Sequence, residues 1–160
     1  MCIRDRYGRI YDIPKVKDHV LDCIEKGVYD PELVNLYTEE EFDKLESFID
    51  HQRDMMFTYA GSRQVVDKYL VQDRSSGAVY ETPQFMYLLI SASIFAEYPK
   101  ETRLDYVRRY YDAISKHKIN IPTPIMGGVR TPLRQFASCV LVDIDDTLDS
   151  IFSSDMAIGK

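Results

Sequence analysis

The spacing of apolar residues in the first part of the chain predicts two amphipathic helices. In residues 13–27 the apolar positions recur at helical spacing, and Gly27 ends the pattern. In residues 38–50 a second apolar stripe follows Thr38, which stands three positions before Glu41. A threonine and a glutamate at this spacing form a capping box, in which each side chain accepts a hydrogen bond from the other residue's backbone N–H. We therefore expect the second helix to begin directly after Thr38.

The next two segments predict a helix and then a β-hairpin. Residues 51–70 continue the helical pattern, and Gly61 is the position at which this helix can break. Two runs of β-prone residues then flank Gly77, which suits the tight turn between two antiparallel strands. Residues 68–82 are therefore expected to form a hairpin.

Two further helices are expected after the hairpin. Thr82 followed by Pro83 is a favourable helix start, and residues 83–99 are apolar on nearly every face. A helix without a polar face is typical of the buried centre of a protein. Residues 100–118 predict another amphipathic helix, whose basic residues we interpret as a solvated surface and whose apolar face consists of Leu104, Val107, Tyr111 and Ile114.

The pattern changes after residue 118. Pro122 and Pro124 cannot lie inside a helix, and the adjacent Gly127 and Gly128 permit backbone conformations closed to other residues, so a loop is expected. Nearly every residue from 136 to 142 is apolar. Such a run is typical of a strand that is covered on both faces in a parallel α/β sheet or barrel.

A last helix is expected over residues 145–158. Leu148 and Ile151 fall on one side of it, and acidic residues occupy its first turn, where the helix dipole favours them. Asp145 or Asp146 is expected to cap its N-terminus.

Composition limits the classes of function. The chain has 160 residues, enough for one domain with its own core. Its formal net charge of −6 argues against a general nucleic-acid-binding surface. Three cysteines, at positions 2, 23 and 139, are too few and too scattered for a disulfide framework or a zinc site. Cys23 lies on an apolar helix face, where a buried structural thiol is the expected role.

The apolar runs and the chain ends predict a location. The longest apolar run, residues 85–96, is shorter than the roughly 20 residues that a membrane span needs. The first residues carry charges where a secretory signal would have an apolar stretch. We therefore expect a cytoplasmic protein without a membrane partner. We interpret residues 1–6 as a non-native start, and we expect a longer parent protein because the last residues stop inside a helix.

Residues 143–148, Asp-Ile-Asp-Asp-Thr-Leu, offer one candidate chemistry. They resemble the D-x-D-x-T loop of haloacid-dehalogenase-type phosphatases, in which Asp143 would be the nucleophile and Asp145 the general acid. In that family the loop opens the domain, and a lysine and further acidic residues follow it. Here a long helical region precedes the loop and only fifteen residues follow Asp145. The phosphatase therefore remains an alternative.

A longer stretch carries a second resemblance. The segment PTPIMGGVRTPLRQFASCVLVDIDDTLDSI, which begins at Pro122, is similar to the large catalytic subunit of class I ribonucleotide reductase. The family signature is a T-P loop followed by R-T-P-x-R-Q-x-x-S-C and then D-[ST]-L-x-S-I, and all three parts occur in order. The resemblance extends back to about Tyr7 and so covers nearly the whole chain. It implies a mainly α protein with a β-hairpin that runs into the first strand and helix of a truncated α/β barrel.

The resemblance implies roles for individual residues. Cys139 would be one of two redox-active thiols that reduce the ribose of a nucleoside diphosphate and end as a disulfide. Ser138 would contact the substrate, and Thr123 would lie near its diphosphate. Without the surrounding motif, Cys139 would be interpreted as a buried strand residue and Thr123 as an ordinary loop threonine.

The resemblance also implies allosteric control. Asp146, Thr147 and Leu148 correspond to the site that binds a deoxynucleoside triphosphate or ATP as specificity effector, with backbone N–H groups at the helix start facing phosphate. In the family this helix lies at the interface of a homodimer, which would couple effector binding to dimer packing. Asp143 and Asp145 then have no assigned chemistry.

The implied domains and partners follow from the same resemblance. After residues 1–6, a helical domain would span residues 7–118 and the start of the barrel residues 119–160. No cofactor or metal would be bound by this chain. A metal-containing small subunit would supply the radical, and thioredoxin or glutaredoxin would restore the thiols. The chain alone is expected to be inactive, and a non-catalytic helical interaction module is the remaining alternative.

Overall fold

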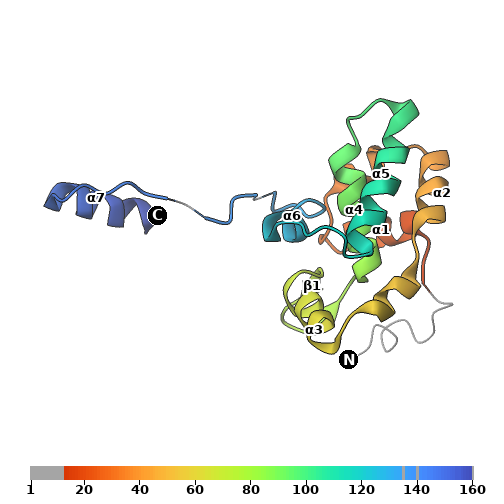
Figure 1. Ribbon diagram of the computed structural model, residues 1–160, viewed down its shortest axis with the longest axis horizontal. Helices are drawn as coiled ribbons and strands as arrows, with labels where there is room; N and C mark the ends of the chain where they lie inside the picture. The colour runs from red at the N-terminus through yellow and green to blue at the C-terminus, as the bar shows by residue number, and fades with distance from the viewer. Residues whose placement is uncertain (1–12, 135, 140, 160) are drawn as a thin grey trace.

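The computed structural model describes residues 13–134, 136–139 and 141–159 (Figure 1). In chain order its elements are α1 (Val16–Glu25), η3 (Pro31–Asn35), α2 (Glu39–Phe48), η4 (His51–Met56), α3 (Tyr59–Lys68), β1 (Gln72–Asp73), β2 (Ala78–Val79), α4 (Pro83–Phe95), α5 (Lys100–Ser115), α6 (Thr123–Gly128) and α7 (Leu148–Ile158), where η marks a 3₁₀-helix. Residues 13–134 form a helical body, and residues 136–139 and 141–159 extend from it as a C-terminal arm (Figure 1). The mainly helical fold with one hairpin is thus confirmed.

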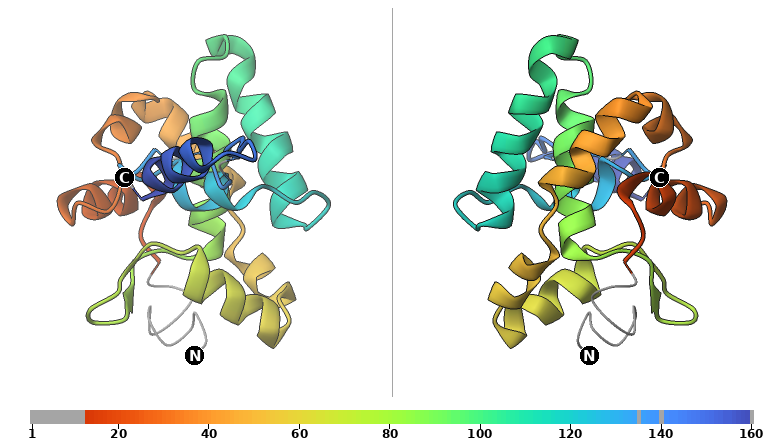
Figure 2. Two further views of the ribbon diagram at one scale, coloured as in Figure 1. Left: turned by 90° about the vertical axis from the view of Figure 1, so that its left-hand side faces the viewer. Right: turned by 90° about the vertical axis from the view of Figure 1, so that its right-hand side faces the viewer.

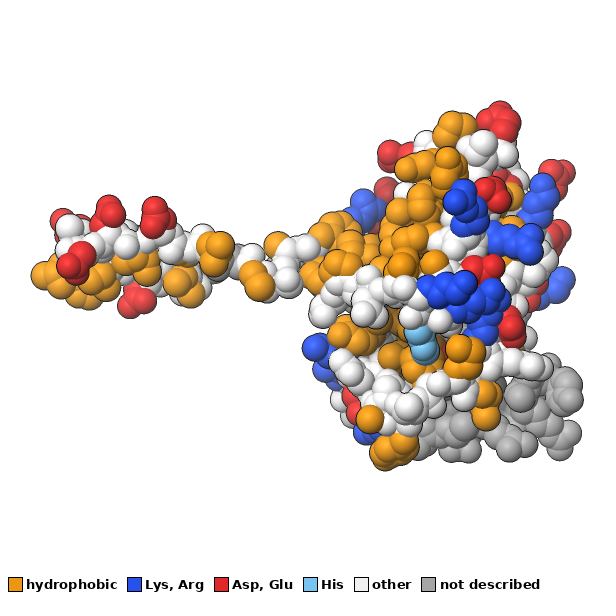
Figure 3. All heavy atoms as spheres, viewed as in Figure 1, with side chains coloured by type: hydrophobic (Ala, Val, Ile, Leu, Met, Phe, Trp, Pro, Cys, Tyr) orange, Lys and Arg blue, Asp and Glu red, His pale blue; other side chains and the backbone are white. Residues whose placement is uncertain are grey.

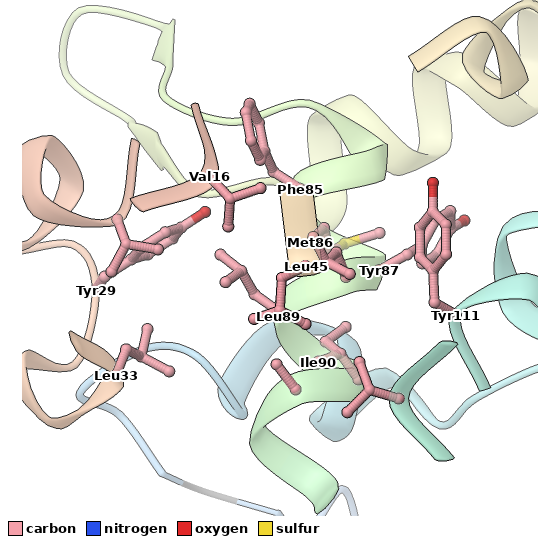
Figure 4. Packing of buried hydrophobic residues seen from close by; sticks show 14 of the residues in the cluster. Val16, Tyr29, Leu33, Leu45, Phe85, Met86, Tyr87, Leu89, Ile90 and Tyr111 are labelled. Atoms are coloured by element: carbon pink, nitrogen blue, oxygen red, sulfur yellow. The ribbon is translucent and has the colours of Figure 1, made fainter. Parts of the chain in front are cut away.

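Helix α4 is the centre of the body. In the side views of Figure 2 it runs through the middle, with α5 on one side and α1 and α2 on the other. Ten consecutive residues from Pro83 to Ala92 are buried, which confirms the expectation drawn from its apolar sequence. Around it gather side chains from α1, η3, α2 and α5 (Figure 4), among them Val16, Leu33, Leu45 and Tyr111.

The local signals for helix ends and turns are confirmed. Thr38 and Glu41 form the expected capping box at the start of α2. The Thr82 hydroxyl accepts a hydrogen bond from the backbone N–H of Phe85 at the start of α4. Gly77 has a φ of +71° in the turn between β1 and β2, whose register pairs Gln72 with Val79 and Asp73 with Ala78. A positive φ is strained for other residues, so the glycine fixes the turn.

Two expected boundaries in the body were wrong. The break in residues 51–70 lies between η4 and α3, where Thr58 caps α3, and Gly61 lies inside that helix. The loop expected around Pro122 and Pro124 contains the short helix α6 instead. Both prolines fit because Pro122 precedes the helix and Pro124 lies in its first turn, where an N–H has no partner within the helix.

One basic residue of α5 does not belong to a solvated surface. Arg103 is buried and its guanidinium pairs with the carboxylate of Glu41, with Nε donating to Oε1 at 2.7 Å. Its Nη1 also donates to the carbonyl of Ala96 at 3.0 Å, and the group stacks over the ring of Tyr37. The prediction failed because helical spacing in α5 cannot show that Glu41 of α2 packs against the polar side of this helix.

The expected strand over residues 136–142 is not formed in the described part of this segment. Residues 136–139 and 141–145 are extended without a strand partner, and no barrel follows from them within the described residues. A strand needs the N–H and C=O groups of a neighbour, whereas a helix satisfies its own. Helix α7 therefore forms as expected, but its cap is Thr147 rather than Asp145 or Asp146.

The described helices also bear on the membrane question. None of those within residues 13–134, 136–139 and 141–159 is both long enough and apolar enough to cross a bilayer.

Candidate functional site

The candidate redox thiol lies in the extended part of the arm. Cys139 is exposed and unbonded to another sulfur, and the Ser138 hydroxyl lies 3.8 Å from its Sγ. The sequence pattern favoured a buried strand for this position, but here the thiol is open to solvent. Cys23, by contrast, lies in α1 with none of its surface exposed, as expected of a structural thiol. Cys2 lies outside the described residues.

The candidate effector residues stand at the start of α7. The Thr147 hydroxyl accepts a hydrogen bond from the backbone N–H of Ser150 at 3.2 Å, so its lone pairs serve the helix cap. The Ser150 hydroxyl in turn accepts from the backbone N–H of Asp145 at 2.9 Å, which closes the turn that leads into the helix. Asp146 and Leu148 are exposed beside this turn.

Thr123 occupies a different place, in the helical body. It is the first residue of α6, and its hydroxyl lies 3.3 Å from the hydroxyl of Tyr69, the residue directly after α3. This hydrogen bond, more than any other neighbour, lowers the pKa of the Tyr69 phenol from its usual value. Both groups are accessible to solvent.

The structure brings only some of the candidate residues together. Ser138 and Cys139 are adjacent, and the residues at the start of α7 form one turn. Thr123 stays on the body while the other two groups lie along the arm that leaves it (Figure 1). Asp143 and Asp145 are exposed, and the described residues hold no cluster of three or more carboxylate, histidine or cysteine groups arranged for a metal ion.

A buried ion pair that the sequence pattern did not reveal fixes the chain ahead of the arm. Arg130 and Glu81 are both fully buried, and the Arg130 Nε donates to Glu81 at 2.7 Å while Nη2 donates to its second oxygen. The Arg130 guanidinium also donates to the carbonyls of Met126 and Tyr69. Burial by itself would lower the pKa of this arginine, but the charge of Glu81 and its hydrogen bonds raise it, so the guanidinium keeps its charge.

The carboxylate of Glu81 is satisfied on every side. Besides Arg130, it accepts hydrogen bonds from the backbone N–H of Val71 at 2.7 Å and from the hydroxyl of Tyr29. The Tyr29 oxygen also lies 3.1 Å from Nε2 of His19, and burial holds the pKa of that histidine down to about 4. The pair therefore joins α1, the hairpin and the end of α6 at one point.

A second arginine of the R-T-P-x-R motif acts on the surface. Arg134 reaches back to the carboxylates of Asp30 and Glu32 at the start of η3, with its Nε donating to Asp30 at 2.8 Å. The backbone N–H of Asp30 also donates to the carbonyl of Arg130 at 3.0 Å. The motif could have pointed to both arginines, but not to their partners, which lie far away in the sequence.

Comparisons of the sequence with known proteins show which family the chain resembles. Residues 55–134 match the family model described as the ribonucleotide reductase all-alpha domain. The chain is 56% identical over 154 residues to the ribonucleoside-diphosphate reductase subunit alpha of Haemophilus influenzae, and 54% identical over 154 residues to the ribonucleoside-diphosphate reductase 1 subunit alpha of Escherichia coli. It is also 46% identical over 152 residues to the subunit alpha protein of Enterobacteria phage T4.

Coverage differs between the two sides of each comparison. The matches to the Haemophilus influenzae and Escherichia coli proteins cover 96% of this chain but 20% of the relative, so the chain spans about a fifth of their length. For the phage T4 protein the corresponding shares are 95% and 20%. On the strength of the family match, which takes in the core helices α4 and α5 and the Arg130 pair, the chain belongs to the ribonucleotide reductase family.

Proposed function

We propose that this chain is part of the catalytic subunit of a ribonucleoside-diphosphate reductase, the enzyme that makes deoxyribonucleoside diphosphates for DNA synthesis. The observation that carries the proposal is the exposed Cys139 thiol, next to Ser138, directly after a domain that matches the family. The relatives that match the chain carry this activity in their names.

Cys139 supplies one of the two thiols that the chemistry needs. Reduction of a ribonucleoside diphosphate replaces the 2′-hydroxyl with hydrogen, and the hydroxyl leaves as water. Two thiols provide the two electrons and two hydrogens and become one disulfide, which thiol exchange can open again. The partner thiol belongs to the remainder of the subunit, because Cys23 is enclosed in the helical core.

Ser138 and Thr123 bind the substrate in this proposal. Ser138 is beside the thiol and contacts the sugar, while the exposed hydroxyl of Thr123 donates to the diphosphate. The two residues come together when the arm folds back as the first barrel strand, supplied with neighbouring strands by the rest of the subunit. Residues 119–160 are thus the start of the barrel, and residues 7–118 the helical domain.

The start of α7 carries the specificity effector, a deoxynucleoside triphosphate or ATP. Asp146 accepts a hydrogen bond from a sugar hydroxyl, and Thr147 and Leu148 contribute the helix start. The exposed apolar side of α7 packs in a homodimer of large subunits, so effector binding and dimerisation are coupled.

The remaining partners follow from the same reaction. A small subunit that contains a metal supplies the radical, and thioredoxin or glutaredoxin re-reduces the disulfide. The family name subunit alpha, carried by the relatives, implies a second kind of subunit. A thiol that must be returned to its reduced form after each turnover suits the reducing cytoplasm.

The phosphatase and the interaction module are weaker candidates. The family match accounts for residues 55–134, which a phosphatase reading of Asp143 and Asp145 leaves unexplained. A non-catalytic module accounts for the helices but gives no role to the exposed Ser138 and Cys139.

The test is a Cys139→Ser variant of the full-length subunit, assayed with small subunit, effector and thioredoxin. The rate of multiple turnover is expected to fall by at least about a thousandfold, because the loss of one reacting group disables the whole set of groups that act together in the reaction. The matched control is Cys23→Ala, which removes the buried thiol and should keep turnover. Undiminished turnover of Cys139→Ser with thioredoxin or a dithiol would refute the proposal.

A further inference from the structure

A second set of polar groups gathers around Thr123 on the surface of the body. Tyr69 caps the C-terminus of α3 and Thr123 begins α6, 54 residues later, yet their hydroxyls lie 3.3 Å apart. Lys68, the last residue of α3, places its Nζ 5.5 Å from the centre of the Tyr69 ring. Two hydroxyls and one ammonium group therefore lie near one another at the surface of the body.

The charge at this place is positive. Arg63 and Asp67, the nearest charged residues of α3, pair with each other at 2.8 Å. Lys68 makes no ion pair with any residue that the structure describes.

The hydrogen-bond inventory leaves donors for a ligand. Tyr69 and Thr123 each carry one hydroxyl proton, and one hydrogen bond between them uses only one of the two. The other proton is free to point outward. The lysine ammonium adds up to three donors, and none of these groups brings a negative charge.

The buried ion pair holds this place in shape. The Arg130 Nη2 donates to the carbonyl of Tyr69 at 3.0 Å, and its Nη1 donates to the carbonyl of Met126 within α6. The backbone of Tyr69 also continues α3, because its N–H donates to the carbonyl of Val65 at 3.0 Å. The two elements that carry the hydroxyls are thus fixed relative to each other before any ligand binds.

We propose that Lys68 and Tyr69 join Thr123 as a subsite for the terminal phosphate of the nucleoside diphosphate substrate. This inference rests on the proposed function, which gives Thr123 its diphosphate. A phosphate group accepts hydrogen bonds at several oxygens, and a lysine neutralises it as a point charge while the hydroxyls set its position. A carboxylate has one fewer oxygen and less charge, and an uncharged sugar gains nothing from the ammonium group.

The electrostatics of Tyr69 agree with this role. The hydrogen bond with Thr123, and then the charge of Lys68, lower the pKa of its phenol, which makes the hydroxyl a stronger donor. These interactions are already present without a ligand.

The experiment compares ligands that differ only in phosphate. In the full-length subunit, at fixed effector concentration, the binding of CDP, CMP and cytidine is measured for Lys68→Gln, Lys68→Arg and Tyr69→Phe. We expect CDP binding to weaken about tenfold in Lys68→Gln and about threefold in Tyr69→Phe, with cytidine unchanged. Lys68→Arg keeps the charge and should keep most of the affinity. Turnover at saturating CDP should be unaltered while KM rises, since the contact is the same in the ground and transition states.

A lysine far from the subsite is the matched control. Lys100 begins α5, at the opposite end of the body from α3 in Figure 1, and it is exposed. Lys100→Gln should bind CDP like the wild type. If Lys68→Gln also binds CDP like the wild type, or if cytidine weakens as much as CDP, this subsite is refuted while the proposed function stands. If the wild-type subunit neither binds nor reduces CDP or any other ribonucleoside diphosphate, both proposals fall.

Discussion

The helical body and the C-terminal arm treat apolar side chains in opposite ways. In the body, α4 buries ten residues in succession and its neighbours close around it (Figure 4). In the arm, Leu141 is 98% exposed, and apolar side chains line its length in Figure 3. The large exposed apolar residues of α7 are Leu148, Ile151, Phe152, Met156 and Ile158.

The difference shows which structure a segment can form by itself. Helix α7 forms because each of its N–H groups beyond the first turn finds a carbonyl within the helix. The apolar run before it has strong strand character, but its described residues, 136–139 and 141–142, have no neighbouring strand within the part of the chain that the structure describes, so they stay extended and unpaired. Helices report local sequence, whereas strands of a parallel sheet depend on chain that lies elsewhere.

The two regions also divide the proposed work. Cys139, Ser138 and the start of α7 lie in the arm, and the residues that fix geometry, Arg130 and Glu81, lie in the body. In the proposed function, the arm adds one strand and one helix to a larger domain. The stability of each region can be measured separately and tests that division.

The largest expected effect is the loss of the buried ion pair. Arg130→Leu leaves the Glu81 carboxylate buried without its counter-charge, and the free energy of unfolding should fall by about 3–5 kcal/mol. Urea denaturation of the chain measures this. The matched control is Arg134→Leu in the same motif, whose ion pairs lie at the surface, so its smaller loss should shrink further with added salt. If the two variants lost equal amounts of unfolding free energy, the buried Arg130–Glu81 pair would be no more important to stability than the surface ion pairs, and the prediction would be wrong.

The second prediction compares one leucine from each region. Leu88→Ala removes a fully buried side chain from α4 and should lower the free energy of unfolding by about 2–5 kcal/mol. Leu141→Ala removes an exposed side chain from the arm and should change it by no more than about 0.5 kcal/mol. Both values come from urea denaturation under one set of conditions. A large loss in Leu141→Ala would mean that the arm packs on the body in solution.

The success of the sequence predictions follows the same division between local and distant causes. Thr38, Thr82 and Gly77 act within a few residues of themselves, and each was placed correctly from the sequence. The buried centre at α4 followed from composition, because a helix that is apolar all round has no other stable place.

The burial of Arg130 and Arg103 could not be predicted from the local sequence. Arg130 pairs with a residue 49 positions away and Arg103 with one 62 positions away, and neither partner leaves a periodic trace. An arginine in a helix is expected to be exposed, because arginines are rarely buried without a partner. The sequence therefore predicted a solvent-exposed side chain for Arg103. Only the fold shows that a carboxylate from another element meets it.

The candidate site came from a motif rather than from physics. Nothing in the periodicity marks Cys139 as reactive, and by pattern alone it was a buried strand residue. The resemblance to the reductase family singled it out, and the family match confirms the membership on which that choice rests. Its chemical role is what the Cys139→Ser experiment tests.

The third prediction concerns Asp54, a carboxyl group in the body whose pKa is raised by burial. Asp54 accepts a hydrogen bond from Gln84 at 2.7 Å, but its Oδ2 is buried without a partner. Burial, assisted by the charge of Asp50 and opposed by the bond from Gln84, raises its pKa to about 7.

Because the unfolded chain loses this proton near pH 4, ionisation of Asp54 destabilises the folded state progressively between about pH 4 and pH 7. Asp54→Asn should therefore gain stability relative to the wild type as the pH rises through this range, by about 1–3 kcal/mol above pH 7. Taking the difference at each pH cancels the opposing titrations of His19 and His51, whose pKa values burial lowers to about 4. The exposed Asp43→Asn serves as control, and a flat difference for Asp54→Asn would contradict the prediction.

The smallest expected effect compares two helix caps of the same kind. Thr38 caps α2 in the body and Thr147 caps α7 in the arm, each through its hydroxyl. Replacing either by alanine removes a comparable local interaction, worth about 1 kcal/mol. Since α2 unfolds with the whole body, Thr38→Ala should lower the global free energy of unfolding by that amount.

Helix α7 should open separately, so Thr147→Ala should leave the global value unchanged and instead speed amide hydrogen exchange within α7, including at Ser150 and Ile151. If Thr147→Ala lowered the global stability as much as Thr38→Ala, the arm would fold cooperatively with the body. The extended, unpaired state of residues 136–139 and 141–145 would then not be the state in solution, and the proposed dependence of the strand on the rest of the subunit would fail.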